Sequence, residues 1–225
     1  MPQNLLERKM IEGKGACFGG ELDLRAGYRL ASRSWKLKNM SFFAKLLKSF
    51  SSRQSPTARK VYDQVIAQSR QVVFYENDRV ADSVSGRFDM IVFHAFLLLH
   101  RLKREGETGK AFGQEVFDIF IEDMDRSLRE MGVGYQAVPK RMKNMGEAFY
   151  GRIAAYDLAV ESGDESAMAE AIERNVFPEH ERAQALSVMF AAYAFTSIEA
   201  LDDYSLYELQ SSDIPFANPQ DFVSE

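Results

Sequence analysis

The sequence has little of what a disulfide scaffold or a metal centre requires. Among 225 residues there are one cysteine, Cys17, and three histidines, His94, His100 and His180. A single cysteine excludes an intramolecular disulfide, and a closed zinc site needs four cysteine or histidine ligands at matched spacing. None of the histidines has the Glu-x-x-His spacing of a two-metal helical bundle. We therefore predict no metal ligand and no cofactor.

The sequence also lacks convincing motifs for nucleotide binding and hydrolysis. Gly13-Lys-Gly15 has neither the spacing of a dinucleotide-binding loop nor a preceding strand, and Ser85 lacks the glycine two residues before it that a nucleophile elbow needs. Acidic residues around Asp123 offer an acid-base group or a metal site as the alternative. Because Arg126 lies within one helical turn of them, an ion-paired helix face is the stronger interpretation. We predict no catalytic residue and no enzyme.

No apolar run is predicted to reach the roughly 18 residues of a membrane-spanning helix. The nearest candidate, from Phe88 to Leu99, contains Asp89 and His94 and is too short. Residues 1–39 have neither the apolar centre of a secretory signal nor the acid-poor composition of a transit peptide, whereas Met40 resembles a natural start. We expect residues 1–39 to be an unstructured extension or a misassigned start.

Charge is divided unequally along the chain. Residues 1–60 contain 13 Lys and Arg against 4 Asp and Glu, whereas residues 61–225 contain 15 against 29. The acidic body argues against nucleic acid as a partner, and the basic leader suits an anionic membrane surface. Residues 42–50 predict a short basic amphipathic helix, either at a membrane surface or docked on the protein's own core. The predicted membrane-surface residues are Phe42, Phe43, Lys45, Leu46, Lys48 and Phe50.

Apolar residues recur at helical spacing through most of the chain, and six prolines interrupt them little. The pattern predicts an all-α antiparallel bundle of about six helices with a flexible N-terminal extension. The predicted helices span residues 57–75, 88–104, 112–131, 139–162, 164–175 and 179–201. Gly132 is predicted to cap a helix in the left-handed conformation. The predicted divisions are a basic extension at 1–53, a helical domain at 54–205 and a loose polar tail at 206–225.

Several polar residues lie close to the apolar stripes. Charges there need partners, so we predict a partly buried polar network that either sets the register of the bundle or faces a groove for a partner helix. His94 is predicted to be a hydrogen-bonded core residue. Four methionines, at positions 124, 131, 142 and 145, offer either an adaptable binding surface or plain core filling.

Three blocks resemble a known family in their residues, order and spacing. They run from Gly86-Arg-Phe-Asp to His94, from Asp123 to Gly134, and through Ala148-Phe-Tyr-Gly-Arg with Tyr156-Asp157. Over residues 58–160 the chain is similar to the ubiquinol-cytochrome c chaperone family. The resemblance implies partner-binding roles for Arg87, Phe88, Asp89, Asp125, Arg129, Glu130, Gly132, Gly134, Tyr150, Gly151 and Arg152. Purely structural roles for the same residues are the alternative.

The resemblance also implies a function. It implies a non-enzymatic chaperone that binds newly made cytochrome b, or a partner factor, to promote assembly of ubiquinol-cytochrome c reductase, which is the bc1 complex or respiratory complex III. The alternative is a helical interaction scaffold with another membrane-associated client. Neither nucleic acid nor a small-molecule substrate is expected. We expect a cytoplasmic protein, peripheral at the inner face of the inner membrane, or on the matrix side in a eukaryote.

Overall fold

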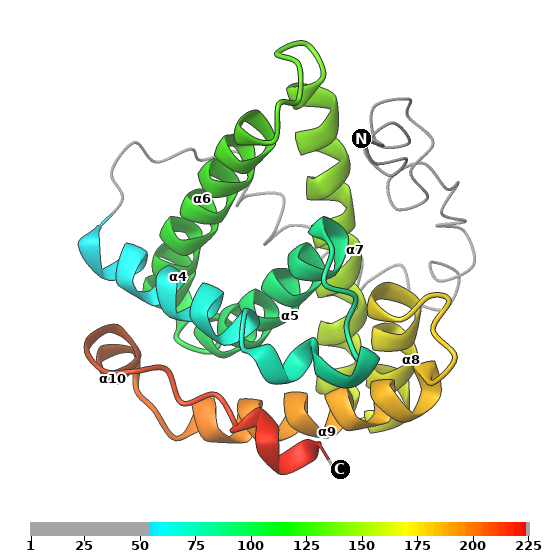
Figure 1. Ribbon diagram of the computed structural model, residues 1–225. Helices are drawn as coiled ribbons and strands as arrows, with labels where there is room; N and C mark the ends of the chain where they lie inside the picture. The colour runs from blue at the N-terminus through cyan, green and yellow to red at the C-terminus, as the bar shows by residue number, and fades with distance from the viewer. Residues whose placement is uncertain (1–54, 224–225) are drawn as a thin grey trace. The chain divides into compact units, whose positions relative to one another are not determined.

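Short polar residues begin several helices of the computed structural model, which describes residues 55–223 (Figure 1). The Ser55 side chain accepts a hydrogen bond from the Ala58 amide at 3.1 Å, at the start of α4. Ser83 caps α5 in the same way, and Asp164 caps α8. These oxygens satisfy amide groups that the first helical turn leaves without a carbonyl partner, and so they set where each helix begins.

The described residues form seven α-helices and three short 3-10 helices, and residues 55–223 contain no strand. The α-helices are α4 (Pro56–Ser69), α5 (Val84–Lys103), α6 (Gly106–Glu130), α7 (Val138–Ser162), α8 (Glu165–Val176), α9 (Ala183–Asp202) and α10 (Leu206–Ser211). The 3-10 helices are η1 (Val72–Phe74), η2 (Glu76–Asp78) and η3 (Pro219–Phe222). The prediction of an all-α fold is confirmed, whereas the N-terminal extension lies outside the described residues.

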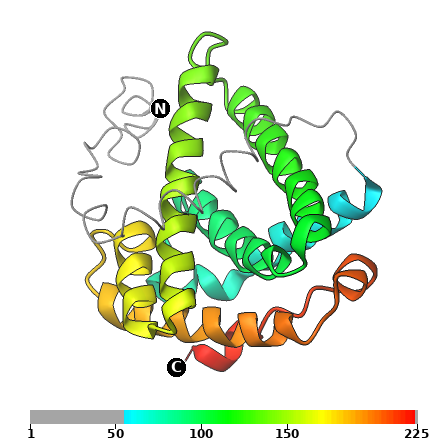
Figure 2. The ribbon, with the colours of Figure 1, turned by 180° about the vertical axis from the view of Figure 1, so that it is seen from behind.

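Helix α5 is the most buried helix of the body, as predicted from its apolar stripe. Met90, Val92, Phe93, Leu97 and Leu98 have no exposed surface. Helices α4, α6, α7, α8 and α9 all contact α5 (Figures 1 and 2). A helix that is apolar on most sides needs neighbours on most sides, so α5 becomes the centre around which the others pack.

The first predicted helix is too long. Helix α4 ends at Ser69, and the chain continues through η1 and η2, where Asn77 has a φ of 53°. The buried Arg79 side chain donates a hydrogen bond to the Val73 carbonyl at 2.9 Å. This contact folds the segment back on itself and buries Phe74, so the apolar spacing that resembled one helix comes from two different structures.

The C-terminal segment is packed, and the expectation of a loose tail from residue 206 onward is wrong. The Ile214 amide donates to Gln64 Oε1 on α4 at 2.7 Å, and the Ala217 amide donates to Ser197 Oγ on α9 at 3.2 Å. Leu209 is fully buried. A few apolar residues spaced along a polar segment are sufficient to hold it against α4 and α9. The overall composition of the segment does not reveal this packing.

Helix α9 contradicts the prediction that no apolar run reaches the length of a membrane-spanning helix. Residues 183–198 carry no charge. By length and composition α9 is the one helix in the described part of the chain that could cross a membrane, although half of its apolar stretch is buried against other helices. Core helices of soluble proteins pass the same test, so this is weak evidence for a membrane span.

Candidate functional site

Asp89 on α5 and Arg152 on α7 form an ion pair that joins the first and third resemblance blocks. Arg152 Nη2 lies 2.7 Å from Asp89 Oδ1, and the two side chains are 15% and 9% exposed. The Arg152 guanidinium also lies over the Phe88 ring, 5.8 Å from its centroid. Burial raises the pKa of Asp89 to about 6, and the charge of Arg152 opposes this rise. Of the polar residues predicted to form a partly buried network, Asp89 and Arg152 therefore meet between α5 and α7.

A second polar contact joins the same two helices. The Asp157 carboxylate lies 2.8 Å from His100 Nδ1 and 2.9 Å from Lys103 Nζ. Burial by itself would raise the pKa of Asp157, but the hydrogen bonds from His100 and Lys103 outweigh it and hold that pKa below its ordinary value. Helices α5 and α7 are thus joined by two charge-assisted contacts from the resemblance blocks and their neighbours.

Gly86 determines how the first block enters α5. A Cβ atom at this position would lie 2.1 Å from the backbone oxygen of Ala81, which no side chain tolerates. The Ser83 hydroxyl accepts a hydrogen bond from the Gly86 amide at 3.1 Å and completes the first turn. The close approach and the cap together direct Asp89 toward α7.

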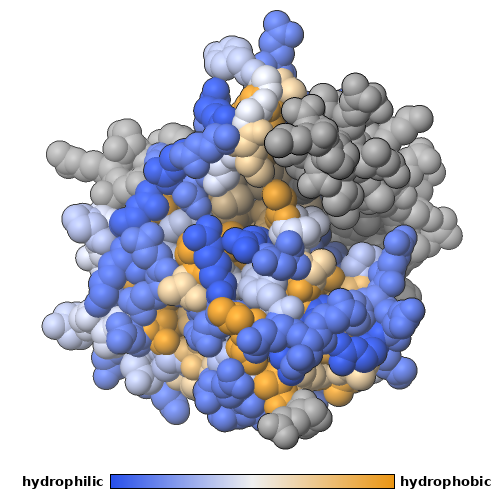
Figure 3. Space-filling model, in the orientation of Figure 1, coloured by the Kyte–Doolittle hydropathy of each residue, from blue (hydrophilic) through white to orange (hydrophobic). Residues whose placement is uncertain are grey.

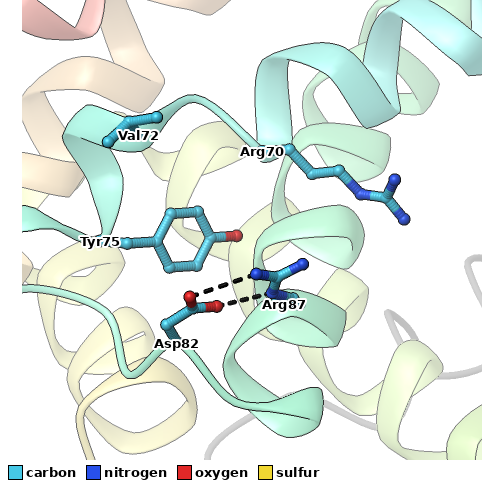
Figure 4. A pocket seen from close by; sticks show the side chains of 5 residues that line it. All are labelled: Arg70, Val72, Tyr75, Asp82 and Arg87. Carbon is cyan, nitrogen blue, oxygen red and sulfur yellow. Dashed lines mark hydrogen bonds and ion pairs between the residues drawn. The ribbon is translucent and has the colours of Figure 1, made fainter.

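Arg87 lies at a different place from Asp89. Its Nε and Nη2 atoms lie 2.6 and 3.2 Å from the two carboxylate oxygens of Asp82. This ion pair lines a pocket of about 130 Å³ together with Arg70, Val72 and Tyr75, between the end of α4 and the start of α5 (Figure 4). Burial raises the pKa of Tyr75 to about 12, so its phenol stays protonated at neutral pH. Arg87 itself is an exposed surface residue.

The second block lies at the turn between α6 and α7, away from α5 (Figures 1 and 2). Arg129 Nε and Nη2 lie 2.6 and 3.1 Å from the two carboxylate oxygens of Asp125. The Arg129 guanidinium also lies 5.5 Å from the ring centroid of Tyr135. Gly132 has a φ of 77°, so the predicted left-handed cap is confirmed. Glu130 and Gly134 are exposed beside it.

The remaining residues of the third block, Tyr150 and Gly151, differ in their structural roles. Tyr150 is half-buried, with its ring centroid 6.1 Å from Phe117 and 5.6 Å from Phe149. Gly151 lies in the interior of α7, and a Cβ atom there would meet nothing within 4 Å. The fold explains Tyr150 as a packing residue, whereas it does not require a glycine at position 151.

The predicted site residues therefore fall into separate places. Phe88, Asp89 and Arg152 meet between α5 and α7, Arg87 lines the pocket at the start of α5, and residues 125–134 run from the last turns of α6 into the α6–α7 turn. Their partner-binding role stays a prediction. The predicted membrane-surface residues at 42–50 lie outside the described residues.

His94 is a hydrogen-bonded core residue, as predicted. Its Nδ1 lies 2.9 Å from the Met90 carbonyl, and its Nε2 lies 3.0 Å from the Tyr193 hydroxyl, to which Gln68 donates at 2.9 Å. Burial lowers the pKa of His94 to about 4, so the ring is neutral at pH 7. The sequence did not identify Gln68 and Tyr193 as members of this hydrogen-bond chain. The available signal was a histidine in an apolar stripe, which implies a polar partner but does not identify it.

The acidic group around Asp123 is an ion-paired face, as predicted. Asp123 Oδ1 lies 2.8 Å from Arg126 Nη2, and Asp123 Oδ2 accepts a hydrogen bond from the Tyr62 hydroxyl at 2.9 Å. Within residues 55–223, no group of three or more histidine, cysteine or acidic side chains is placed to hold a metal ion.

The four methionines do not form one surface. Met124 and Met145 are buried, Met142 is half-buried, and Met131 is 47% exposed at the α6–α7 turn. Two of the four therefore fill the core, and only Met131 presents a large exposed surface to a partner.

Comparison with known proteins connects these residues to one family. A family model described as ubiquinol-cytochrome C chaperone matches residues 76–216. The match extends well past residue 160, where the resemblance found in the sequence ends. The mouse ubiquinol-cytochrome c reductase complex assembly factor 1 is 28% identical over 120 residues, which are 53% of this chain and 40% of the mouse protein. The Xenopus laevis factor is 29% identical over 103 residues, or 46% of this chain and 51% of that protein.

The chain spans about half, or less, of the length of these curated relatives. A crystal structure of the Cbp3 homolog from Brucella abortus is 35% identical, with a TM-score of 0.67, and the match covers 82% of this chain and 97% of that one. Since the family model covers more than half of the sequence and the bacterial structure matches almost from end to end, the chain belongs to the ubiquinol-cytochrome c chaperone family.

Proposed function

We propose that this chain is an assembly factor for ubiquinol-cytochrome c reductase and that it acts by binding, without making or breaking a covalent bond. The observation that carries the proposal is the family match over residues 76–216. The names of the vertebrate relatives and the near-complete match to the Brucella Cbp3 homolog agree with it.

The client that we propose is newly made cytochrome b, or a partner factor that holds it. One feature of the body supports a binding role. The Asp89–Arg152 pair and the Asp157 contacts fix α7 against α5, so surface residues on these helices are held in position before a partner arrives.

Disruption of the gene tests this function. We expect the reduced cytochrome b absorbance and the bc1 activity of membranes to fall to background, and both to return when the gene is restored. Pull-down with the tagged chain is expected to recover bc1 subunits, whereas recovery of unrelated membrane proteins would favour a general scaffold. Cytochrome b at normal level and normal bc1 activity in the disrupted strain would contradict the proposal.

We also propose that the protein is peripheral at the inner face of the inner membrane, or on the matrix side in a eukaryote. The basic amphipathic pattern of residues 42–50 supports this location. Deletion of residues 40–52 is expected to move a large part of the protein from the membrane fraction to the soluble fraction, because it removes the apolar side chains at helical spacing and the lysines between them. Unchanged fractionation of the deletion variant would contradict the role of this segment.

A further inference from the structure

The α6–α7 turn with the helix ends that flank it, residues 129–143, is a basic tip on an acidic body. These residues contain four Lys and Arg against one Glu, whereas the other described residues contain 13 Lys and Arg against 27 Asp and Glu. Lys140 and Arg141 are exposed, and the Lys143 side chain is 76% exposed. Because Asp125 pairs with Arg129, the cations most available to a partner are the three on α7.

These three basic side chains contribute little to the stability of the fold. They lie in the first two turns of α7, whose first turn contains no acidic residue. The start of a helix carries a partial positive charge, so basic side chains there are unfavourable to the helix. Neither Lys140 nor Arg141 has an ion-pair partner within the described part of the chain, and Lys143 Nζ lies 3.8 Å from Glu147 in an exposed contact of little energy.

The tip also exposes apolar surface. Met131 is 47% exposed and Tyr135 is 80% exposed, and the Arg129 guanidinium against the Tyr135 ring favours one orientation of that ring. Val133 is half-buried between them. Hydrophilic and apolar residues lie side by side where the turn projects in Figure 3. An exposed tyrosine and methionine next to lysine and arginine is the composition that sits at a lipid–water interface.

We propose that the α6–α7 tip is a contact site for an anionic lipid surface. Lys140, Arg141 and Lys143 bind headgroup phosphates, while Met131 and Tyr135 enter the interface between headgroups and acyl chains. A projecting turn contacts a flat bilayer without a complementary pocket, whereas a stable protein interface buries about 800 Å² on each partner. The acidic remainder of the body is repelled by the same surface, so the tip faces the membrane.

This inference does not depend on which client the protein binds. It is tested with the purified full-length chain and vesicles of phosphatidylcholine with or without phosphatidylglycerol. Sedimentation is expected to show binding to the anionic vesicles that weakens with salt. The variant Lys140→Ala/Arg141→Ala/Lys143→Ala is expected to lower the partition coefficient about a hundredfold, from roughly 1 kcal/mol for each basic side chain near an anionic surface.

A matched control removes three basic residues from the body, Arg104→Ala/Lys110→Ala/Arg174→Ala. It is expected to bind within about twofold of the unaltered chain, because charges far from the bilayer are screened. Both triple variants retain residues 42–50, so any contribution of that segment cancels. Equal losses in the two variants, or wild-type binding by the tip variant, would overturn the proposal. A tip variant that binds vesicles normally but no longer recovers bc1 subunits would assign the tip to a protein partner instead.

A spectroscopic test reports on the tip directly. Tyr135→Trp in a Trp35→Phe background places the chain's only tryptophan at the turn. Its emission is expected to shift to shorter wavelength with anionic vesicles and to stay unchanged with pure phosphatidylcholine. Unchanged emission at vesicle concentrations that sediment the protein would contradict insertion of the tip.

Discussion

Replacing Arg152 with methionine is expected to lower the free energy of unfolding by about 3–5 kcal/mol at pH 7.5. Methionine occupies a similar volume but leaves the Asp89 carboxylate 9% exposed and without its counter-charge. The matched control is Arg129→Met, since Arg129 makes a two-point pair with Asp125 on the exposed face of α6. That change is expected to lower the free energy by less than about 1 kcal/mol, and urea denaturation measures both.

The loss of stability caused by Arg152→Met is also expected to depend on pH. The pKa of Asp89 is already raised to about 6 with Arg152 in place, and removing the cation raises it further. Between its ordinary pKa and this raised value, the folded chain holds a proton that the unfolded chain releases, so stability increases as pH falls. The difference between Arg152→Met and the unaltered chain therefore shrinks from pH 7.5 to pH 4.5. A deficit that is constant across this range would show that lost packing, and not the buried charge, causes the effect.

The double variant Asp89→Leu/Arg152→Met separates a structural role of this pair from a partner-binding role. Replacing a buried ion pair by apolar residues of similar size is often neutral for stability or favourable. We expect the double variant to recover most of the stability that Arg152→Met loses. If it folds but fails to restore bc1 activity in the disrupted strain, the pair also contacts a partner, whereas full restoration would limit the pair to holding α5 against α7.

Substituting alanine at Gly86 is expected to destabilise the protein by at least about 3 kcal/mol, at the upper end of the range for overpacking. The added Cβ meets the Ala81 backbone oxygen at 2.1 Å, and a backbone atom cannot rotate away as a side chain can. The start of α5 has to shift, which moves Asp89 away from Arg152.

Gly151→Ala is the matched control on α7. Its Cβ enters open space, and alanine in a helix interior is favoured over glycine by about 1 kcal/mol. This change is therefore expected to raise the thermal midpoint, while Gly86→Ala lowers it. Similar destabilisation by both would contradict the close approach at Gly86. A stabilised Gly151→Ala that loses bc1 activity would indicate that a partner approaches α7 closely at this position.

Much of the fold is predictable because it depends on local patterns. The apolar stripes identified α5, α6 and α7, and Gly132 was correctly assigned as a left-handed cap. The limit of α4 was not predictable, because Val72 and Val73 continue the helical spacing although they belong to η1. The packed C-terminus was missed for the opposite reason, since its contacts with α4 and α9 are made by single residues far apart in the sequence.

The sequence alone determined the all-α class and the family resemblance, because helical periodicity and motif spacing are properties of neighbouring residues. Only the tertiary structure decided which polar residues of those motifs meet. Asp89 and Arg152 are 63 positions apart in the sequence yet form one buried pair, while Arg87, two positions before Asp89, pairs with Asp82 at the surface. Successive residues of a helix point in different directions, so their partners depend on how α5 packs, and packing is a property of the whole chain.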